Sequence, residues 1–237
     1  MAAPRPWTVL PHDAWERLTE SVWTVSGALP DMALRRRMTA VKLSDGRVVI
    51  HGAACLEEPA MRELEAWGEP SVMVVPNGFH RLDAHAWKVR YPNIQVLCPA
   101  DADAAVRKVV AVDGHYDAFP RDAKVTLTPL AGMSRRVPEG VLSAVSPDGR
   151  AAHVFNDALF NHPHMPGFTG WVMKTMGSTG GPRVSGLMSL VGVSDRKALN
   201  EHYRQLASTP GLAFALPGHG DVISGDVKAV LTQVASG

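Results

Sequence analysis

Apolar runs and amphipathic stretches alternate along this chain of 237 residues, and they predict a mixed α/β protein. The central segment, residues 72–99 (VMVVPNGFHRLDAHAWKVRYPNIQVLCP), shows the pattern most clearly. Its apolar start at 72–75 predicts a buried strand that a Pro-Asn-Gly turn ends, a helical pattern follows a polar loop, and 94–97 predicts a second strand. Because ligands of open α/β proteins bind beyond the carboxyl ends of strands, we expect the polar loop to belong to the site.

The same patterns predict further elements on both sides of that segment. Predicted strands cover residues 21–25, 38–43, 47–51, 125–129, 141–145, 151–155 and 213–216, and predicted helices cover 57–67, 99–110, 194–208 and 225–234. Residues 27–30 predict a turn. Residues 1–20 predict an N-terminal arm with a helical turn at 13–18, and residues 21–237 a single domain. Within that domain, 161–192 is rich in Gly, Pro, Met and Ser and predicts a long loop insertion with short helical pieces. Two sheets packed face to face, with helices on their outer faces, account for this order.

Composition and charge narrow the class of protein and of partner. Apolar residues make up 46% and charged residues 20%, and the formal net charge is +1, so we expect a soluble globular protein that binds neither nucleic acid nor a membrane. No apolar run reaches the ~18 residues of a membrane span. The start MAAPRPWTVL lacks the charged region and apolar core of a secretory signal, so we expect a cytoplasmic protein. Cys55 and Cys98 form no C-x-x-C pair and are expected to be buried, reduced thiols.

Four landmarks, in order along roughly residues 20–235, resemble the metallo-β-lactamase superfamily. They are the hairpin closing on DGRVVIHG, the loop and helix before YPNIQVLCP, the strand in SPDGRAAHVFNDALF, and the turn ALPGHGDVI. The resemblance implies an αββα sandwich of two mixed sheets with helices on the outer faces. It also implies that Asp157 stands for the family's metal-bridging aspartate and His219 for its last metal-binding histidine.

The chain departs from that family where the metal signature H-x-H-x-D-H would stand. The matching stretch is NGFHRLDAH, in which only His80, Asp83 and His85 remain, off the usual spacing. Met133 stands where another metal histidine would be, and a thioether does not replace imidazole at a hydrolytic zinc. The pattern resembles an uncharacterised subgroup that keeps PN..H and W..RYP in place of the signature, so the resemblance implies no known substrate.

Five residues are the candidates for a site. His80, Asp157 and His219 are the candidate metal ligands, and Asp157 is also the candidate catalytic group. His80, Arg81 and His164 are the candidate substrate contacts. The guanidinium of Arg81 could hold an anionic substrate by forked hydrogen bonds. Structural interpretations stay open for each of them: a turn histidine, a cap by the aspartate, or a solvated arginine.

The remaining polar residues are interpreted as structural or solvated. Asp83 and His85 are expected to be solvated or to support the site, and His162 could face the same cleft as its neighbour His164. The Arg35-Arg36-Arg37 run is expected to lie on a solvated edge. The other histidines are read as structural: His51, His115, His153 and His202.

Two functions of different classes follow from this pattern. In the first, the scaffold has a degenerate site without metal and binds an unknown small molecule or partner without hydrolysis. In the alternative, one zinc or iron held by His80, Asp157 and His219 serves a mononuclear hydrolase of an ester, amide or phosphoester. The loss of three usual ligands favours the first. Oligomeric state is not determined by these patterns.

Overall fold

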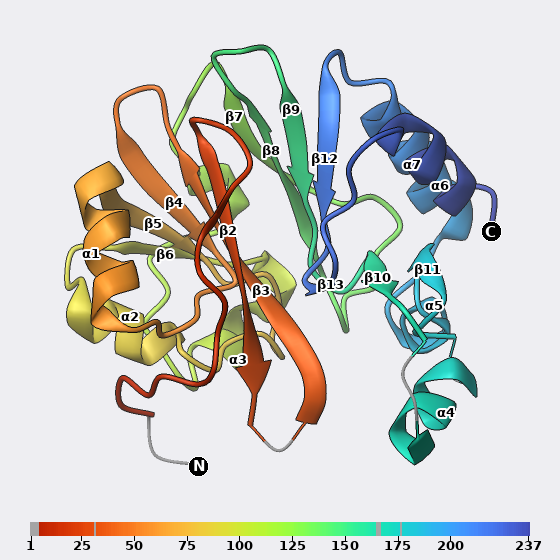
Figure 1. Cartoon of the computed structure of the whole chain (residues 1–237), viewed down its shortest axis with the longest axis horizontal. Helices are drawn as coiled ribbons and strands as arrows, with labels where there is room; N and C mark the ends of the chain where they lie inside the picture. Colours follow the sequence, from red (N-terminus) through yellow and green to blue (C-terminus); the bar gives the residue numbers. More distant parts are fainter. Residues whose placement is uncertain (1–4, 31, 165–166, 176) are drawn as a thin grey trace.

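The computed structural model describes residues 5–30, 32–164, 167–175 and 177–237. Two sheets lie face to face, and helices cover their outer faces (Figure 1). Residues 1–4 of the predicted arm lie outside the described residues. In the described part of the chain, no helix is both long and apolar enough to cross a membrane.

The first sheet has six strands in sequence order, β1-β2-β3-β4-β5-β6. They span Glu16–Arg17, Val22–Leu29, Met32–Lys42, Arg47–His51, Glu69–Val74 and Gln95–Leu97. The first four pair antiparallel, whereas β4–β5 and β5–β6 pair parallel, so that the carboxyl ends of β4 and β5 lie side by side. The predicted Ser-Asp-Gly hairpin turn joins β3 to β4, and Gly46 there has a φ of 90°.

The second sheet has the order β12-β9-β8-β7. A small sheet of β11-β10-β13 extends from the end of it at which β9 and β12 finish (Figure 1). These strands, β7 to β13 in chain order, span Val125–Pro129, Gly140–Val145, Ala151–Val154, Phe160–His162, Gly181–Arg183, Leu212–Leu216 and His219–Gly220. β9 and β12 pair parallel, as do β10 and β13. The α-helices α1 to α7 span Glu58–Trp67, Ala84–Arg90, Asp103–Val106, Gly167–Thr175, Gly186–Val191, Arg196–Ala207 and Val227–Val234.

Three separate apolar clusters hold these layers together. One packs the outer face of the first sheet under α1 and α2 and includes Met61, Leu64 and Trp87. A second fills the space between the sheets, and a third packs α6 and α7 onto the outer face of the second sheet. Three apolar layers between four layers of secondary structure are what an αββα sandwich requires, so the predicted fold class is confirmed.

Several local predictions were wrong. The predicted turn at 27–30 overlaps the end of β2, because β3 pairs with that strand over its whole length. The predicted helical turn at 13–18 contains the short strand β1 instead. The helix predicted at 99–110 reduces to a 3₁₀ turn and α3. The segment 161–192, predicted as a long loop with short helical pieces, does hold two short helices, α4 and α5, but it also contains most of β10 and all of β11. In each case, tertiary pairing or packing decided what the local pattern left open.

The arginine run is also not a solvated edge. It lies within β3, where Arg36 and Arg37 are each only 8% exposed. Arg36 forms a buried ion pair with Asp83, which was expected to be solvated or to support the site. Arg35 forms an exposed ion pair with Asp13 at 2.8 Å. Two cations of the run are therefore part of the interior.

The burial of His153 makes the free energy of unfolding depend on pH. It lies on β9 between Ser143 and α6, with Nδ1 2.8 Å from the Ser143 hydroxyl and Nε2 3.2 Å from the Leu206 carbonyl oxygen. Burial lowers the pKa of His153 from 6.5 to about 4. As the pH is lowered, the unfolded chain protonates this imidazole before the folded chain does. The free energy of unfolding is therefore highest above pH 6.5 and falls as the pH drops toward 4.

We expect this one histidine to remove about 3 kcal/mol of stability over that pH window. The measurement is urea unfolding of wild type and His153→Gln from neutral pH to the acid limb. The variant is expected to lose less stability on acidification, and His164→Gln, at an exposed position, serves as the control. Equal pH slopes in wild type and His153→Gln would contradict the assignment.

Candidate metal centre

The site lies at one end of the sandwich, where segments from both sheets meet. His80 stands in the loop after β5, Asp157 directly after β9, and His219 in β13. One ligand atom from each residue lies within 4.8 Å of the other two. The His80 Nε2 is 3.0 Å and the His219 Nε2 3.4 Å from the same carboxylate oxygen, Asp157 Oδ1. The three candidate metal ligands thus converge on one point.

The orientation of His219 directs its Nε2 at Asp157, and a proton or a metal ion is needed between these two atoms. Its Nδ1 is 2.7 Å from the Arg35 carbonyl oxygen, and because a carbonyl only accepts, Nδ1 carries the hydrogen. In the neutral ring, Nε2 would then present a lone pair to the carboxylate oxygen of Asp157. Either a second proton on the ring or a metal ion between the two atoms removes this conflict. Phe160 stacks on the ring, with centroids 5.2 Å apart, and fixes its plane.

Asn77 joins the loop that carries His80 to Asp157. Its side-chain oxygen accepts hydrogen bonds from the backbone N–H of Phe79 and His80, at 2.8 and 3.2 Å. Its Nδ2 donates to Asp157 Oδ2 at 2.8 Å, which leaves the other carboxylate oxygen for the histidines. Asn77 is fully buried, so this geometry is rigid. The sequence pattern showed this residue only as part of a strand-ending turn.

Glu139 holds the segment that carries Asp157. Its buried carboxylate accepts from the backbone N–H of Asn156 at 2.6 Å and of Ala158 at 2.9 Å. Burial and the negative charge of Asp157 raise the pKa of Glu139 above its ordinary value. Burial alone would also raise the pKa of Asp157, but the charge of His80 and the hydrogen bonds from both histidines outweigh it and lower that pKa. Asp157 is therefore the ionised member of this carboxyl pair.

Two further buried imidazoles flank the group. His51 ends β4 on the same face as Val49, which belongs to the cluster between the sheets, so its ring points toward the site end of the interior. Burial and the charge of His80 lower the pKa of His51 to about 3. Burial and the charge of His219 lower the pKa of His162. The Nε2 of each has no hydrogen-bond partner within the described residues. Sequence reasoning interpreted His51 as structural only.

The turn that carries His219 is fixed from two sides. Arg37 donates from Nε to the Pro217 carbonyl at 3.2 Å and from Nη2 to the Gly220 carbonyl at 2.6 Å. Gly220 has a φ of 94°, and a Cβ there would lie 2.1 Å from the Asn161 carbonyl oxygen. Glycine at this position therefore permits the close backbone approach that the turn requires.

Gly220→Ala is therefore expected to lower the free energy of unfolding by more than about 2 kcal/mol, because backbone strain and a backbone clash add. Gly149→Ala is the matched control, since Gly149 has a φ of 83° and open space where its Cβ would stand. Its expected cost is about 1 kcal/mol. Thermal and urea unfolding measure both, and equal losses would show that the clash at Gly220 is relieved.

The other predicted site residues, Arg81 and His164, and also Met133 have their observed contacts outside this group. Arg81 donates from Nη1 to the Ala105 carbonyl and is half-buried. His164 is exposed, with Nδ1 3.0 Å from the Thr179 hydroxyl. Met133 packs at the edge of the cluster beneath α6. None of these three belongs to the His-Asp-His group.

The residues present fit one metal ion. Two imidazole nitrogens and one carboxylate oxygen are the donors that zinc takes at a site with an open fourth position. Two ligand atoms at about 2.1 Å from a tetrahedral ion stand ~3.4 Å apart. The His219–Asp157 separation is 3.4 Å, and the His80–Asp157 separation of 3.0 Å requires only a small adjustment. The hydrogen bonds of His219 to Arg35 and of Asp157 to Asn77 are the kind of outer contacts that orient metal ligands.

Comparison with known proteins shows similarity in structure and not in sequence. No family model matches the chain, and no curated protein matches its sequence. The structure is similar to a metallo-β-lactamase from Pontibacter korlensis, with 12% identity, coverage of 94% of this chain and 98% of that one, and a TM-score of 0.58. A metallo-β-lactamase from Erythrobacter litoralis gives 12% identity, coverage of 94% and 95%, and a TM-score of 0.60. FIM-1 from Pseudomonas aeruginosa, solved in a mono-zinc form, gives 12% identity, coverage of 96% of each chain and a TM-score of 0.58. Over nearly its whole length, this chain has the metallo-β-lactamase fold.

Proposed function

We propose that His80, Asp157 and His219 bind one divalent metal ion, zinc or iron, and that the protein is a mononuclear metal-dependent hydrolase. The observation that carries the proposal is the convergence of two imidazole nitrogens on one oxygen of Asp157. Because Nδ1 of His219 donates to a carbonyl, its Nε2 can offer a lone pair to a metal ion between it and Asp157. A fold relative solved in a mono-zinc form supports the idea that this scaffold can hold a single ion.

The bound ion would supply a Lewis acid and lower the pKa of a water molecule to about 7, which suits hydrolysis of an ester, amide or phosphoester. The chain's own residues divide the remaining tasks. Asp157 supplies negative charge and, because its pKa is lowered, orients groups rather than accepting a proton. His80 has the most exposed side chain of the three, at 19%, so substrate reaches the group from its side. Asn77 and Glu139 hold the carboxylate in place.

A second function, binding of a small molecule without hydrolysis, is supported by a different observation. The H-x-H-x-D-H signature is absent, and the His-Asp-His group satisfies its own polar atoms if His80 and His219 donate protons to Asp157. In that case the buried charges would neutralise each other without a metal. The earlier preference for this function weakens because the three ligands converge, which the sequence did not show.

Metal content and hydrolysis together test the proposal. The protein is purified without a tag, and its metals are measured by mass spectrometry beside His80→Ala and His219→Ala. His85→Ala is the control, because His85 lies in α2, close in sequence to His80, and does not belong to the His-Asp-His group. We expect about one equivalent of metal in wild type and control and much less in both site variants.

Ester, amide and phosphodiester substrates are then assayed with the metal-loaded protein and after chelation. Hydrolysis that chelation removes and zinc or iron restores would support the hydrolase. A protein that binds one metal ion but hydrolyses no substrate class would support metal-dependent binding instead. A folded protein that takes up no added zinc, iron or manganese would overturn the metal site and leave the non-hydrolytic binder.

A further inference from the structure

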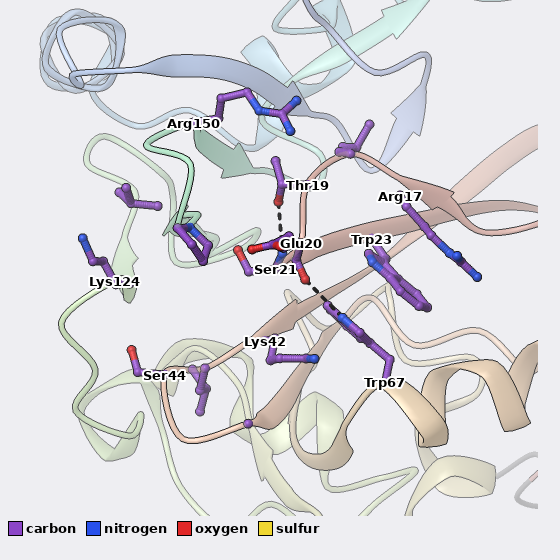
Figure 2. A pocket seen from close by; sticks show the side chains of 15 residues that line it. Arg17, Thr19, Glu20, Ser21, Trp23, Lys42, Ser44, Trp67, Lys124 and Arg150 are labelled. Carbon is purple, nitrogen blue, oxygen red and sulfur yellow. Dashed lines mark hydrogen bonds between the residues drawn. The ribbon is translucent and has the colours of Figure 1, made fainter.

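A large pocket lies at the other end of the sandwich from the metal centre. Its volume is ≈ 910 Å³, which is in the range of small-molecule sites. Residues before β2 and β7, the β3–β4 turn and the β8–β9 turn line it (Figure 2). Arg150 of this pocket directly precedes β9, and Asp157 follows the end of the same strand. The two places are thus separated by the length of β9, and a ligand in the pocket would touch both sheets.

The pocket carries an excess of positive charge although the whole chain is nearly neutral. Four cations and one carboxylate line it: Arg17, Lys42, Lys124 and Arg150 against Glu20. Arg17 and Arg150 are already paired, with Glu63 and Asp148. Among the described residues, no carboxylate lies within 4.0 Å of the ammonium of Lys42 or Lys124. These two lysines, one from each sheet, are available to an anion.

Asp122, a carboxylate close in sequence to the pocket's edge at Lys124, accepts hydrogen bonds mainly from backbone groups. Asp122 accepts from Ser44 N at 2.7 Å and from Lys124 N at 2.7 Å. Its oxygens also accept from the Ser44 hydroxyl and from Val125 N. Asp122 thereby ties the β3–β4 turn of the first sheet to the start of β7 in the second. This linkage fixes the backbone near both free lysines.

Aromatic and hydroxyl groups form the rest of the wall. The indoles of Trp23 and Trp67 stack with centroids 4.3 Å apart, and Lys42 lies over the outer face of Trp67 at 4.6 Å. The Trp67 Nε1 donates to the Glu20 carbonyl at 3.1 Å, which fixes that ring (Figure 2). Ser21 lies at the pocket floor, with its hydroxyl 2.6 Å from that of Ser146. The pocket therefore combines apolar edges, hydroxyl groups and free positive charge on a rigid frame.

We propose that this pocket binds a small organic anion that carries a phosphate-like group and an apolar or aromatic body. Lys42 would hold the anionic group, the rim of the neighbouring Trp67 would contact the body, and Lys124 would add positive charge from the opposite side of the pocket (Figure 2). A phosphate-type dianion fits better than a polyanion such as nucleic acid, because the positive charge is confined to a pocket and the chain's net charge is only +1. The site is independent of the metal centre.

The test uses three probes on the full chain: 1-naphthylphosphonate, 1-naphthol and methylphosphonate. The first has body and dianion and cannot be hydrolysed at the metal centre, whereas the others have one part each. Binding is followed by calorimetry and by tryptophan fluorescence at low salt. Lys42→Gln and Lys124→Gln remove the free charges, and Lys108→Gln removes an exposed charge from α3's C-terminal flank as the matched control.

We expect saturable binding of naphthylphosphonate at one site. Replacement of both pocket lysines removes the free positive charge and should lower the affinity about tenfold, which corresponds to ~1.4 kcal/mol. Lys108→Gln should bind like wild type, and naphthol and methylphosphonate should each bind at least about tenfold more weakly than the combined probe. An equal loss in Lys108→Gln would overturn the proposal in favour of long-range attraction. Equal binding of naphthol would overturn it in favour of apolar adsorption, and so would the absence of saturable binding by a folded protein.

Discussion

Asp157→Asn is expected to lower zinc affinity at least about 100-fold while the protein stays folded, a larger loss than the ~10–100-fold that removal of an outer partner of a metal ligand causes. The substitution keeps the shape of the side chain and removes its charge. Both imidazoles point at Oδ1 of this residue, at 3.0 and 3.4 Å, so no other described carboxylate can complete the group. Competition with a zinc chelator of known affinity measures the effect without any assay of activity.

Asn77→Ala provides the graded comparison. It removes the hydrogen bonds to Asp157 Oδ2 and to the loop of His80, but leaves every ligand in place. Its expected loss is the ~10–100-fold typical of such contacts. His85→Ala should leave affinity unchanged. If Asp157→Asn bound zinc as tightly as wild type, the ion would have to be held by other groups, and the assignment of Asp157 would be wrong.

Asp83→Ala is expected to cost about 3–5 kcal/mol of stability. Asp83 is fully buried and forms an ion pair with Arg36, whose side chain is 9% exposed. Its Oδ2 also accepts from the backbone N–H of Cys55 at 2.9 Å. Removal of the carboxylate leaves the guanidinium of Arg36 in the interior without its partner. The free energy of unfolding therefore falls by the cost of keeping that charge out of water.

A double variant separates that penalty from the net contribution of the ion pair. Asp83→Leu with Arg36→Met replaces both charges by apolar groups and is expected to recover most of the loss, because neither charge is then left unpaired. Glu201→Ala breaks an exposed pair with Arg204 and should cost at most about 1 kcal/mol. Urea unfolding measures all four proteins. A loss at Asp83→Ala no larger than that at Glu201→Ala would mean that water reaches Arg36.

The sequence by itself determined the sandwich and most of its elements. The turn Ser44-Asp45-Gly46, the Asp195 cap of α6 and the apolar runs of β5 and β6 are local signals, because turn chemistry, capping and periodicity act over a few residues. The chain's resemblance to the metallo-β-lactamase superfamily pointed to Asp157 and His219, and the loop after the central strand pointed to His80; the fold brings these three together at one end of the sandwich.

Tertiary structure decided what those local signals could not. Arg36 and Arg37 look like surface charge in sequence, yet Asp83 and the carbonyls of the His219 turn, 47 and 180 positions away, make them interior groups. Asn77, Glu139 and His51 gain their importance only from Asp157 and His80, which approach them from other strands. The distance between two histidines and one oxygen, which decides whether a metal can bind, depends on how two sheets pack. No pattern along the chain encodes that separation.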